Sequence, residues 1–88
     1  MKLREGLILR YVDGMPIVVP LGEAAVSFNG MIRLNESGAL LWRRLSEGAD
    51  RAALVNALEE AYTVSAAEAE ADVDAFLAPL LSAGFLEA

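Results

Sequence analysis

The side chains that could take part in chemistry are carboxylates and hydroxyls, because the chain contains no His and no Cys. A serine nucleophile needs a neighbouring base to accept its proton, and His is the usual one. Lys is an alternative base, but the only Lys stands at position 2, beside the N-terminus. We therefore expect no nucleophilic catalysis from the five serines, which are Ser27, Ser37, Ser46, Ser65 and Ser82.

Pairs of carboxylates could in principle act as general acid and base. Glu59 with Glu60, or Asp72 with Glu68, have the required residue types, but such pairs on a small helical surface are far more typical of a solvated face. A metal site would have to use carboxylates alone, and no Asp/Gly-rich loop of EF-hand spacing is present. The glycines are isolated and form no phosphate-binding loop. The sequence therefore predicts a protein that is not an enzyme and that holds no metal and no cofactor.

The length of 88 residues leaves room for one hydrophobic core, so we expect a single domain over residues 1–88. The apolar fraction of 56% is too high for a disordered chain. Near the N-terminus, Glu5 and Arg10 are atypical of a signal peptide. No apolar stretch approaches about 18 residues, so we expect no membrane span and a cytoplasmic protein.

The charges are distributed unevenly along the chain, whose net charge is −6. From Ala52 to Ala88 there are seven carboxylates and neither Lys nor Arg. Affinity for nucleic acid depends mainly on neutralising phosphates with basic side chains. The C-terminal part is therefore unsuited to reading DNA, and we expect a peptide ligand instead.

The predicted elements that position these residues begin with a β-hairpin. Leu7–Val12 and Met15–Pro20 are two short aliphatic-rich segments joined by Asp13-Gly14. This dipeptide is typical of type I′ turns, in which both central residues have positive φ. Pro16 and Pro20 lie near the ends of the second segment, where a missing N–H is tolerated.

A second turn signal, Asn29-Gly30, follows a predicted connection over Leu21–Ala25. It predicts that Val26–Phe28 pairs with a third strand, Met31–Leu34. Alternation then divides the side chains of the third strand between two faces, Ile32 and Leu34 on one and Met31 and Arg33 on the other.

Three helices are predicted after the third strand, and each has a recognisable N-cap. Asn35, Asp50 and Ser65 are the capping residues, and Ser65 forms a capping box with Glu68. Gly48 is placed to end the first helix. Apolar residues at helical spacing predict the buried faces, which are Leu41, Trp42 and Leu45, then Leu54, Val55, Leu58, Ala61 and Tyr62, then Ala69, Val73, Phe76, Leu77 and Leu80.

Glycine and proline mark special positions in these helices. Gly38 lies in the apolar stripe of the first helix, which predicts the close approach of a strand or another helix. Pro79 removes one backbone hydrogen bond from the third helix, but the apolar spacing continues beyond it. We therefore expect a kink near Ala75–Ala78 rather than an end. Gly84 should end the helix, and Phe85-Leu86 should fold back on the core.

Together these elements predict an α+β fold, winged-helix-like, in which a three-stranded antiparallel sheet is followed by a three-helix bundle. Such a sheet leaves two edge strands with unpaired backbone groups. Met31–Leu34 contains neither Pro nor Lys to block its edge. If this edge borders the third helix, an extended peptide could add there as a fourth strand, with alternate side chains in pockets lined by helix residues.

Nearly the whole chain resembles a known family. The matching segments are Arg4-Glu5-Gly6, Val18-Val19-Pro20, Leu34-Asn35-Glu36-Ser37-Gly38, Leu41-Trp42, Leu58–Tyr62, Asp72-Val73, Phe76-Leu77 and Gly84-Phe85-Leu86. In these segments the sequence is similar to the PqqD-like proteins. Those are recognition domains for leader peptides in the pathways of ribosomally made, post-translationally modified peptides (RiPPs).

The resemblance implies a non-catalytic protein that binds the leader segment of a precursor peptide and delivers it to a maturation enzyme, often a radical SAM enzyme. It also implies that the leader pairs with the third strand and packs against the third helix. The peptide-binding residues would then be Met31, Ile32, Arg33, Leu34, Asp72, Val73, Phe76 and Leu80. Leader peptides commonly carry carboxylates, so Arg33 is a candidate ion-pair partner, and Asp72 could hold a basic residue of the same peptide.

Two other functions are open at this point. The order of elements also fits a winged-helix DNA-binding regulator, in which Arg43, Arg44 and Arg51 would form a small basic patch. A plain dimerisation module without peptide cargo is the other alternative. Our leading prediction is the leader-binding protein, with no nucleic-acid or membrane partner, as a monomer or weak homodimer.

Overall fold

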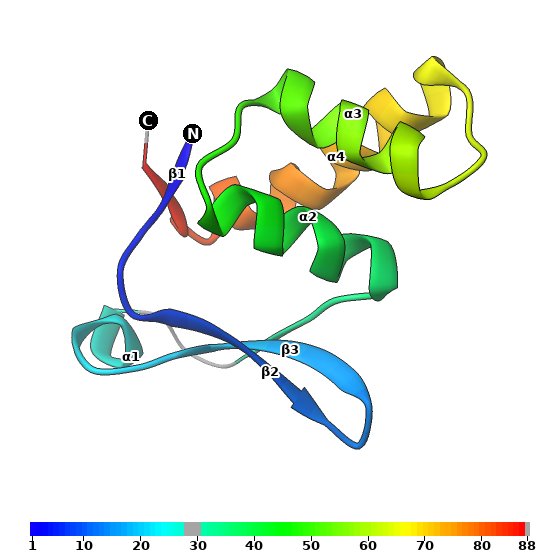
Figure 1. The fold of residues 1–88 in the computed structure, drawn as a ribbon. Coiled ribbons are helices and arrows are strands. Elements are labelled where there is room, and N and C mark those ends of the chain that lie inside the picture. The colour runs from blue at the N-terminus through cyan, green and yellow to red at the C-terminus, as the bar shows by residue number, and fades with distance from the viewer. Residues whose placement is uncertain (28–30, 88) are drawn as a thin grey trace.

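The computed structural model describes residues 1–27 and 31–87 and arranges them as a β-sheet layer beneath a group of helices (Figure 1). The sheet contains β2 (Leu7–Val12), β3 (Met15–Pro20) and β4 (Ile32–Arg33), with β3 in the centre. Both strand pairs are antiparallel. Because β4 is much shorter than β2 and β3, the hairpin of β2 and β3 makes up most of the sheet.

Three helices follow β4 in the sequence and lie on one side of the sheet (Figure 1). They are α2 (Glu36–Ser46), α3 (Arg51–Ala61) and α4 (Ala66–Ser82). An antiparallel sheet of three strands followed by these helices confirms the predicted α+β fold class.

The turn between β2 and β3 has the predicted conformation. Asp13 and Gly14 have φ values of +51° and +79°, and Val12 lies opposite Met15 in the ladder. A two-residue turn with positive φ at both positions follows the right-handed twist of the two strands. The sequence signal at Asp13-Gly14 is therefore confirmed.

The segment after β3 differs from the prediction. The sequence predicts a connection over Leu21–Ala25 and a strand beginning at Val26, but the structure forms a short helix, α1 (Glu23–Ser27). Ala has the highest helix propensity, and Ala24 is buried against the start of the hairpin. A Cβ added to Gly6 would lie only 2.9 Å from the Ala24 Cβ. The short helix therefore combines a favourable local composition with close packing on a residue far away in the sequence.

The third strand is also shorter than predicted and has a different partner. Phe28 and the predicted Asn29-Gly30 turn lie outside the described residues. β4 covers Ile32–Arg33 rather than Met31–Leu34, and it pairs with β3. The predicted pairing with Val26–Phe28 is wrong in its described part, because Val26 is helical and offers no strand.

The ends of the helices confirm the capping signals. The side-chain oxygens of Asn35, Asp50 and Ser65 accept hydrogen bonds from the backbone N–H groups three residues further on, at 2.7, 2.8 and 3.1 Å. Gly48 follows α2 with a φ of +94°, which glycine adopts most easily. Helix α4 continues through Pro79, so Pro79 does not end it. The kink stays a prediction.

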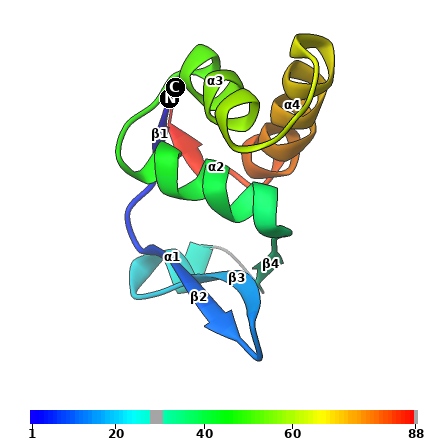
Figure 2. The same cartoon turned by 45° about the vertical axis from the view of Figure 1, so that its right-hand side comes forward.

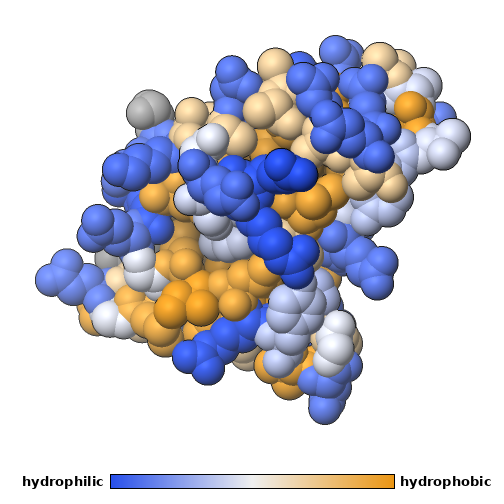
Figure 3. Space-filling model, viewed as in Figure 1, coloured by the Kyte–Doolittle hydropathy of each residue, from blue (hydrophilic) through white to orange (hydrophobic). Residues whose placement is uncertain are grey.

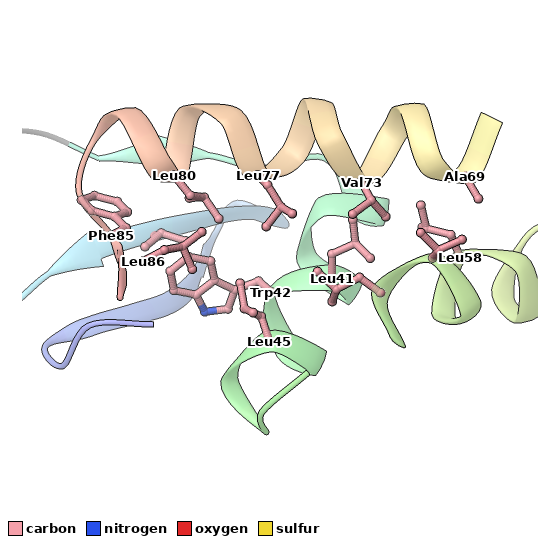
Figure 4. Packing of buried hydrophobic residues seen from close by; sticks show 13 residues of the cluster. Leu41, Trp42, Leu45, Leu58, Ala69, Val73, Leu77, Leu80, Phe85 and Leu86 are labelled. Carbon is pink, nitrogen blue, oxygen red and sulfur yellow. The ribbon is translucent and has the colours of Figure 1, made fainter. Parts of the chain in front are cut away.

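The helices enclose the hydrophobic core, with α4 lying across α2 (Figure 4). Val73, Leu77 and Leu80 of α4 point towards α2, where Leu41 and Trp42 are equally buried. The sheet adds the fully buried Val18 from its central strand, and α3 adds Leu54 and Leu58.

Two residues predicted to be buried differ from the structure. Ala61 and Tyr62 are exposed; α3 ends at Ala61 and the backbone of Tyr62 is extended. At Gly38 an added Cβ would lie 2.9 Å from the Asn35 Oδ1 and 3.4 Å from the Leu34 Cβ. Leu34 is the last residue of the predicted third strand, so of the two expected partners, a strand or another helix, it is the strand segment that approaches this glycine.

The two ends of the chain lie side by side (Figure 2). β1 (Lys2–Leu3) pairs antiparallel with β5 (Leu86–Glu87), and the Arg4 N–H donates to the Phe85 carbonyl at 2.9 Å. Phe85 and Leu86 are 3% and 7% exposed, which confirms that this tail folds back on the core.

Candidate functional site

Both outer strands of the sheet, β2 and β4, pair on one side only among the described residues, and the β4 edge is the one that lies beside α4. β4 pairs with β3 on one side, and no other strand of the described chain pairs with it. The Leu34 N–H donates to the Pro16 carbonyl at 2.9 Å, which continues the ladder beyond β4. Hydrogen-bonded and non-bonded pairs alternate in an antiparallel ladder, so Arg33, one residue earlier, turns its N–H and C=O away from β3. Arg33 therefore offers one backbone donor and one acceptor at the open edge.

A groove lies between this edge and α4. Figure 2 shows β4 below the C-terminal part of α4, with the start of α2 beside them. The groove has a volume of about 560 Å³. Leu41 and Leu80, each 1% exposed, form its apolar floor, and the half-buried Phe76 stands in its wall. The lining residues are Ile32, Arg33, Leu34, Asn35, Ser37, Gly38, Leu41, Asp72, Ala75, Phe76, Pro79 and Leu80.

The structure brings together most of the residues predicted for the peptide site. Six of the eight line the groove, namely Ile32, Arg33, Leu34, Asp72, Phe76 and Leu80. Met31 precedes β4, is 66% exposed and does not line it. Val73 has no exposed surface and packs in the core, so its side chain is not accessible to a ligand.

The remaining groove residues were not predicted, although the sequence held signals for some of them. Ala75 and Pro79 lie three and seven positions after Asp72, at the helical spacing that puts them on one face of α4. Asn35 was predicted only as the N-cap of α2, and its Oδ1 accepts the Gly38 N–H. Gly38 also lines the groove, and an added Cβ there would lie 2.9 Å from the Asn35 Oδ1.

A second pocket, of about 360 Å³, continues the groove around the N-terminal end of α2. It shares Asn35, Ser37 and Asp72 with the first pocket. Its other lining residues are Glu36, Leu58, Tyr62 and Val64. An extended ligand along β4 could therefore continue towards α3.

The charged groups near the groove differ in their surroundings. The Arg33 side chain is exposed and has no hydrogen-bond or ion-pair partner among the described residues. Arg51 donates two hydrogen bonds to the Asp74 carboxylate, at 2.8 and 3.0 Å, and links α3 to α4. These hydrogen bonds lower the pKa of Asp74 and raise the pKa of Arg51. Asp72 is exposed and is therefore available to a ligand.

The one hydroxyl group among the described side chains that line the groove has no basic partner. This hydroxyl, that of Ser37, donates to the Asn35 Oδ1 at 3.1 Å, and an amide oxygen is no general base. Across residues 1–27 and 31–87, no three acidic side chains gather closely enough to hold a metal ion. In the same part of the chain, no helix has the length and apolar character needed to cross a membrane.

These features define a class of small α+β domains with an open sheet edge beside a helix-lined groove. Residues 6–86 match the sequence model of a family described as coenzyme PQQ synthesis protein D, PqqD. The chain therefore belongs to the PqqD family, as its sequence motifs predict. No curated protein matches the chain in sequence.

Two solved structures share this fold. One is that of TbiB1 in complex with the TbiA(beta) leader peptide, with a TM-score of 0.78 and 24% sequence identity. The match covers 99% of this chain and 95% of that chain. The other is that of a lasso peptide synthetase B1 complexed with the leader peptide, with a TM-score of 0.71 and 23% identity over 92% of this chain and 89% of that one.

Proposed function

We propose that this protein binds the leader segment of a precursor peptide as an additional strand at the open edge of β4. It does so without catalysis of its own and presents the peptide to a modifying enzyme in the cytoplasm. The observation that carries the proposal is the juxtaposition of the free backbone groups of Arg33 with an apolar groove under α4.

The geometry supports strand addition in two ways. The N–H and C=O of Arg33 can hydrogen-bond an extended backbone, which supplies affinity without regard to sequence. Alternate side chains of that peptide would then point into the groove, where Phe76 and Leu80 provide apolar contacts. Sequence preference would come from these pockets and from the charges of Arg33 and Asp72.

The family and the shared fold support the same proposal. The chain belongs to the PqqD family over residues 6–86. Both solved structures of this fold described above are complexes with leader peptides. The apolar groove between β4 and α4 also supports it, because six of the eight residues predicted to bind the leader line this groove.

No observation favours the DNA-binding alternative. Arg51 is held by Asp74 on the acidic helix α4. Arg43 hydrogen-bonds the Tyr11 hydroxyl and lies over its ring, 5.6 Å from the centroid. Of the three arginines in the predicted basic patch, only Arg44 is without such a partner in the described chain. The Tyr11 hydroxyl is neutral, so Arg43 and Arg44 keep their charge, but two cations in a chain of net charge −6 are a weak basis for neutralising a phosphate backbone.

Calorimetric titration with the synthetic leader of the precursor encoded beside the gene tests the proposal. We expect a dissociation constant in the micromolar range or tighter, equivalent to about −8 kcal/mol. A scrambled leader of the same composition is the control for non-specific binding. In NMR spectra, the amides of Arg33 and of the groove face of α4 should shift most. Absence of binding to the leader, or shifts confined to another surface, would overturn the proposal.

A further inference from the structure

The sheet has a second face that the helices do not cover. Leu7, Leu9 and Val18 of the hairpin pack on the helical core. Strand side chains alternate between faces, so the residues between them point the other way. In Figures 1 and 2, α2, α3 and α4 lie on one side of the hairpin only. We call the opposite side the outer face; its apolar residues are Ile8, Val12, Met15, Ile17 and Val19.

The apolar residues of the outer face are not part of the hydrophobic core. None of them belongs to the core cluster or packs against it. Val12, Ile8 and Met15 are 52%, 40% and 37% exposed. Figure 3 shows the molecule from the side, so that the outer face is seen only at its edge; apolar residues are visible along the hairpin and below α2, and hydrophilic residues are prominent over α3 and α4. Contiguous exposed apolar surface on a small domain is typical of an interaction site.

Two arginines cross the centre of the outer face. Ile17 lies opposite Arg10 on one side and opposite Arg33 on the other, so the three side chains form one row across the sheet. Arg10 and Arg33 are exposed, and neither has a hydrogen-bond or ion-pair partner in the described chain. β2, β3 and β4 contain no Asp or Glu, so the outer face lacks carboxylates of its own.

This charge pattern identifies the kind of surface that would fit. Two copies of the chain packed outer face to outer face would bring guanidinium groups together with no carboxylate between them, which is unfavourable when water is excluded. The complementary surface is instead apolar, with Asp or Glu side chains at its border.

The position of the outer face indicates which partner carries that surface. A peptide added to β4 would extend the sheet, and every second side chain of the peptide would lie on the outer face beside Arg33. A protein docked on this face would therefore contact both the sheet and the bound peptide. An enzyme that acts on the peptide has to contact it, so this enzyme is the partner that best fits the face.

We propose that the outer face of the sheet docks the modifying enzyme, through an apolar patch of the enzyme bordered by carboxylates. The identity of this partner rests on the proposed function, but of the residues named for the docking face only Arg33 also lines the groove. Arg10 allows the docking face to be tested separately from the groove, because it lies on β2, two strands away from β4.

Arg10→Glu tests the proposal, with the modifying enzyme encoded beside the gene as the probe. The change should leave the melting temperature unchanged and the leader dissociation constant within about twofold, and it should weaken enzyme binding at least about tenfold. Biolayer interferometry on the immobilised enzyme measures this affinity, which should also fall as salt is raised. Arg44→Glu is the matched control, because it changes the net charge equally on exposed α2 surface and should leave enzyme binding unchanged.

Val12→Ser is a second probe, which removes apolar surface without changing charge, and it should weaken enzyme binding by about threefold or more. Enzyme affinity equal to that of the wild type in a folded Arg10→Glu variant would overturn the proposal. A wild-type dimer in sedimentation experiments that Arg10→Glu dissociates would also overturn it, by assigning the face to a second copy. Failure of the leader to bind the wild type would refute the proposed function alone, since weaker enzyme binding by Arg10→Glu would still support the docking face.

Discussion

Replacing Arg33 with Glu tests whether the peptide lies against the open edge of β4. The Arg33 side chain is exposed and has no partner among the described residues, so the fold does not depend on its charge. Changes at such surface positions usually alter the free energy of unfolding by less than about 0.5 kcal/mol. The melting temperature of Arg33→Glu should therefore stay close to that of the wild type.

The expected loss of leader affinity follows from the position of Arg33. An exposed ion pair contributes about 0.2–1 kcal/mol, and every second side chain of an added peptide strand would lie beside Arg33 on the same face of the sheet. Charge reversal replaces this attraction with a repulsion of similar size. We therefore expect a loss of about 1–2 kcal/mol in binding free energy, which is an increase of about 5- to 30-fold in the dissociation constant.

Fluorescence anisotropy of a labelled leader peptide at low and moderate salt measures this effect. The difference between wild type and Arg33→Glu should shrink as salt is raised, because screening weakens exposed charge pairs. Arg44→Glu is the matched control, since Arg44 is exposed on α2 and lies outside the groove. Unchanged leader affinity in folded Arg33→Glu would remove this side chain from the site. An equal loss from Arg44→Glu would move the site to α2.

Three further predictions follow from burial and charge. Phe76→Ala removes the half-buried wall of the groove and should weaken leader binding by about tenfold while costing about 1–2 kcal/mol of stability; unaltered binding by titration would contradict the groove site. Leu54→Ala, at a position with no exposed surface and outside the groove, should cost about 2–5 kcal/mol in chemical denaturation and leave leader affinity of the folded protein unchanged. Because hydrogen bonds from Arg51 lower the pKa of Asp74, their stabilising effect is present at neutral pH and is lost as the pH falls through the pKa of the folded state. Asp74→Asn should therefore lower the melting temperature slightly at pH about 7, and the difference should disappear at pH about 2; a difference that persists in acid would show another cause.

The sequence by itself determined the features that depend on neighbouring residues. Asn35, Asp50 and Ser65 cap helices because their side chains reach N–H groups only three residues away. Asp13-Gly14 forms the hairpin turn because both residues tolerate positive φ. These short-range interactions need no knowledge of the rest of the chain, and together with the apolar periodicity of the segments they predicted the order of the elements and the fold class. The family was predicted separately, from the resemblance of whole segments of the sequence.

Within the site, sequence periodicity identified the correct face of α4 but not the depth of each residue. Val73 and Phe76 are one turn apart, and both belong to the apolar face predicted for this helix. In the structure, however, Val73 is enclosed by the core, whereas Phe76 lies in the groove wall. Burial depends on which other elements pack against a residue, and that information is absent from the spacing along one helix.

Only the tertiary structure decided how segments far apart in the sequence meet. The pairing of β1 with β5 joins the two ends of the chain, and β4 pairs with β3 across the intervening helix α1. Ala24 of that helix packs closely on Gly6, which lies eighteen positions earlier in the sequence. Such long-range contacts compensate the entropy of closing the chain only when many of them form together, so no single segment encodes them. The open edge of β4 and its groove are products of this cooperative packing.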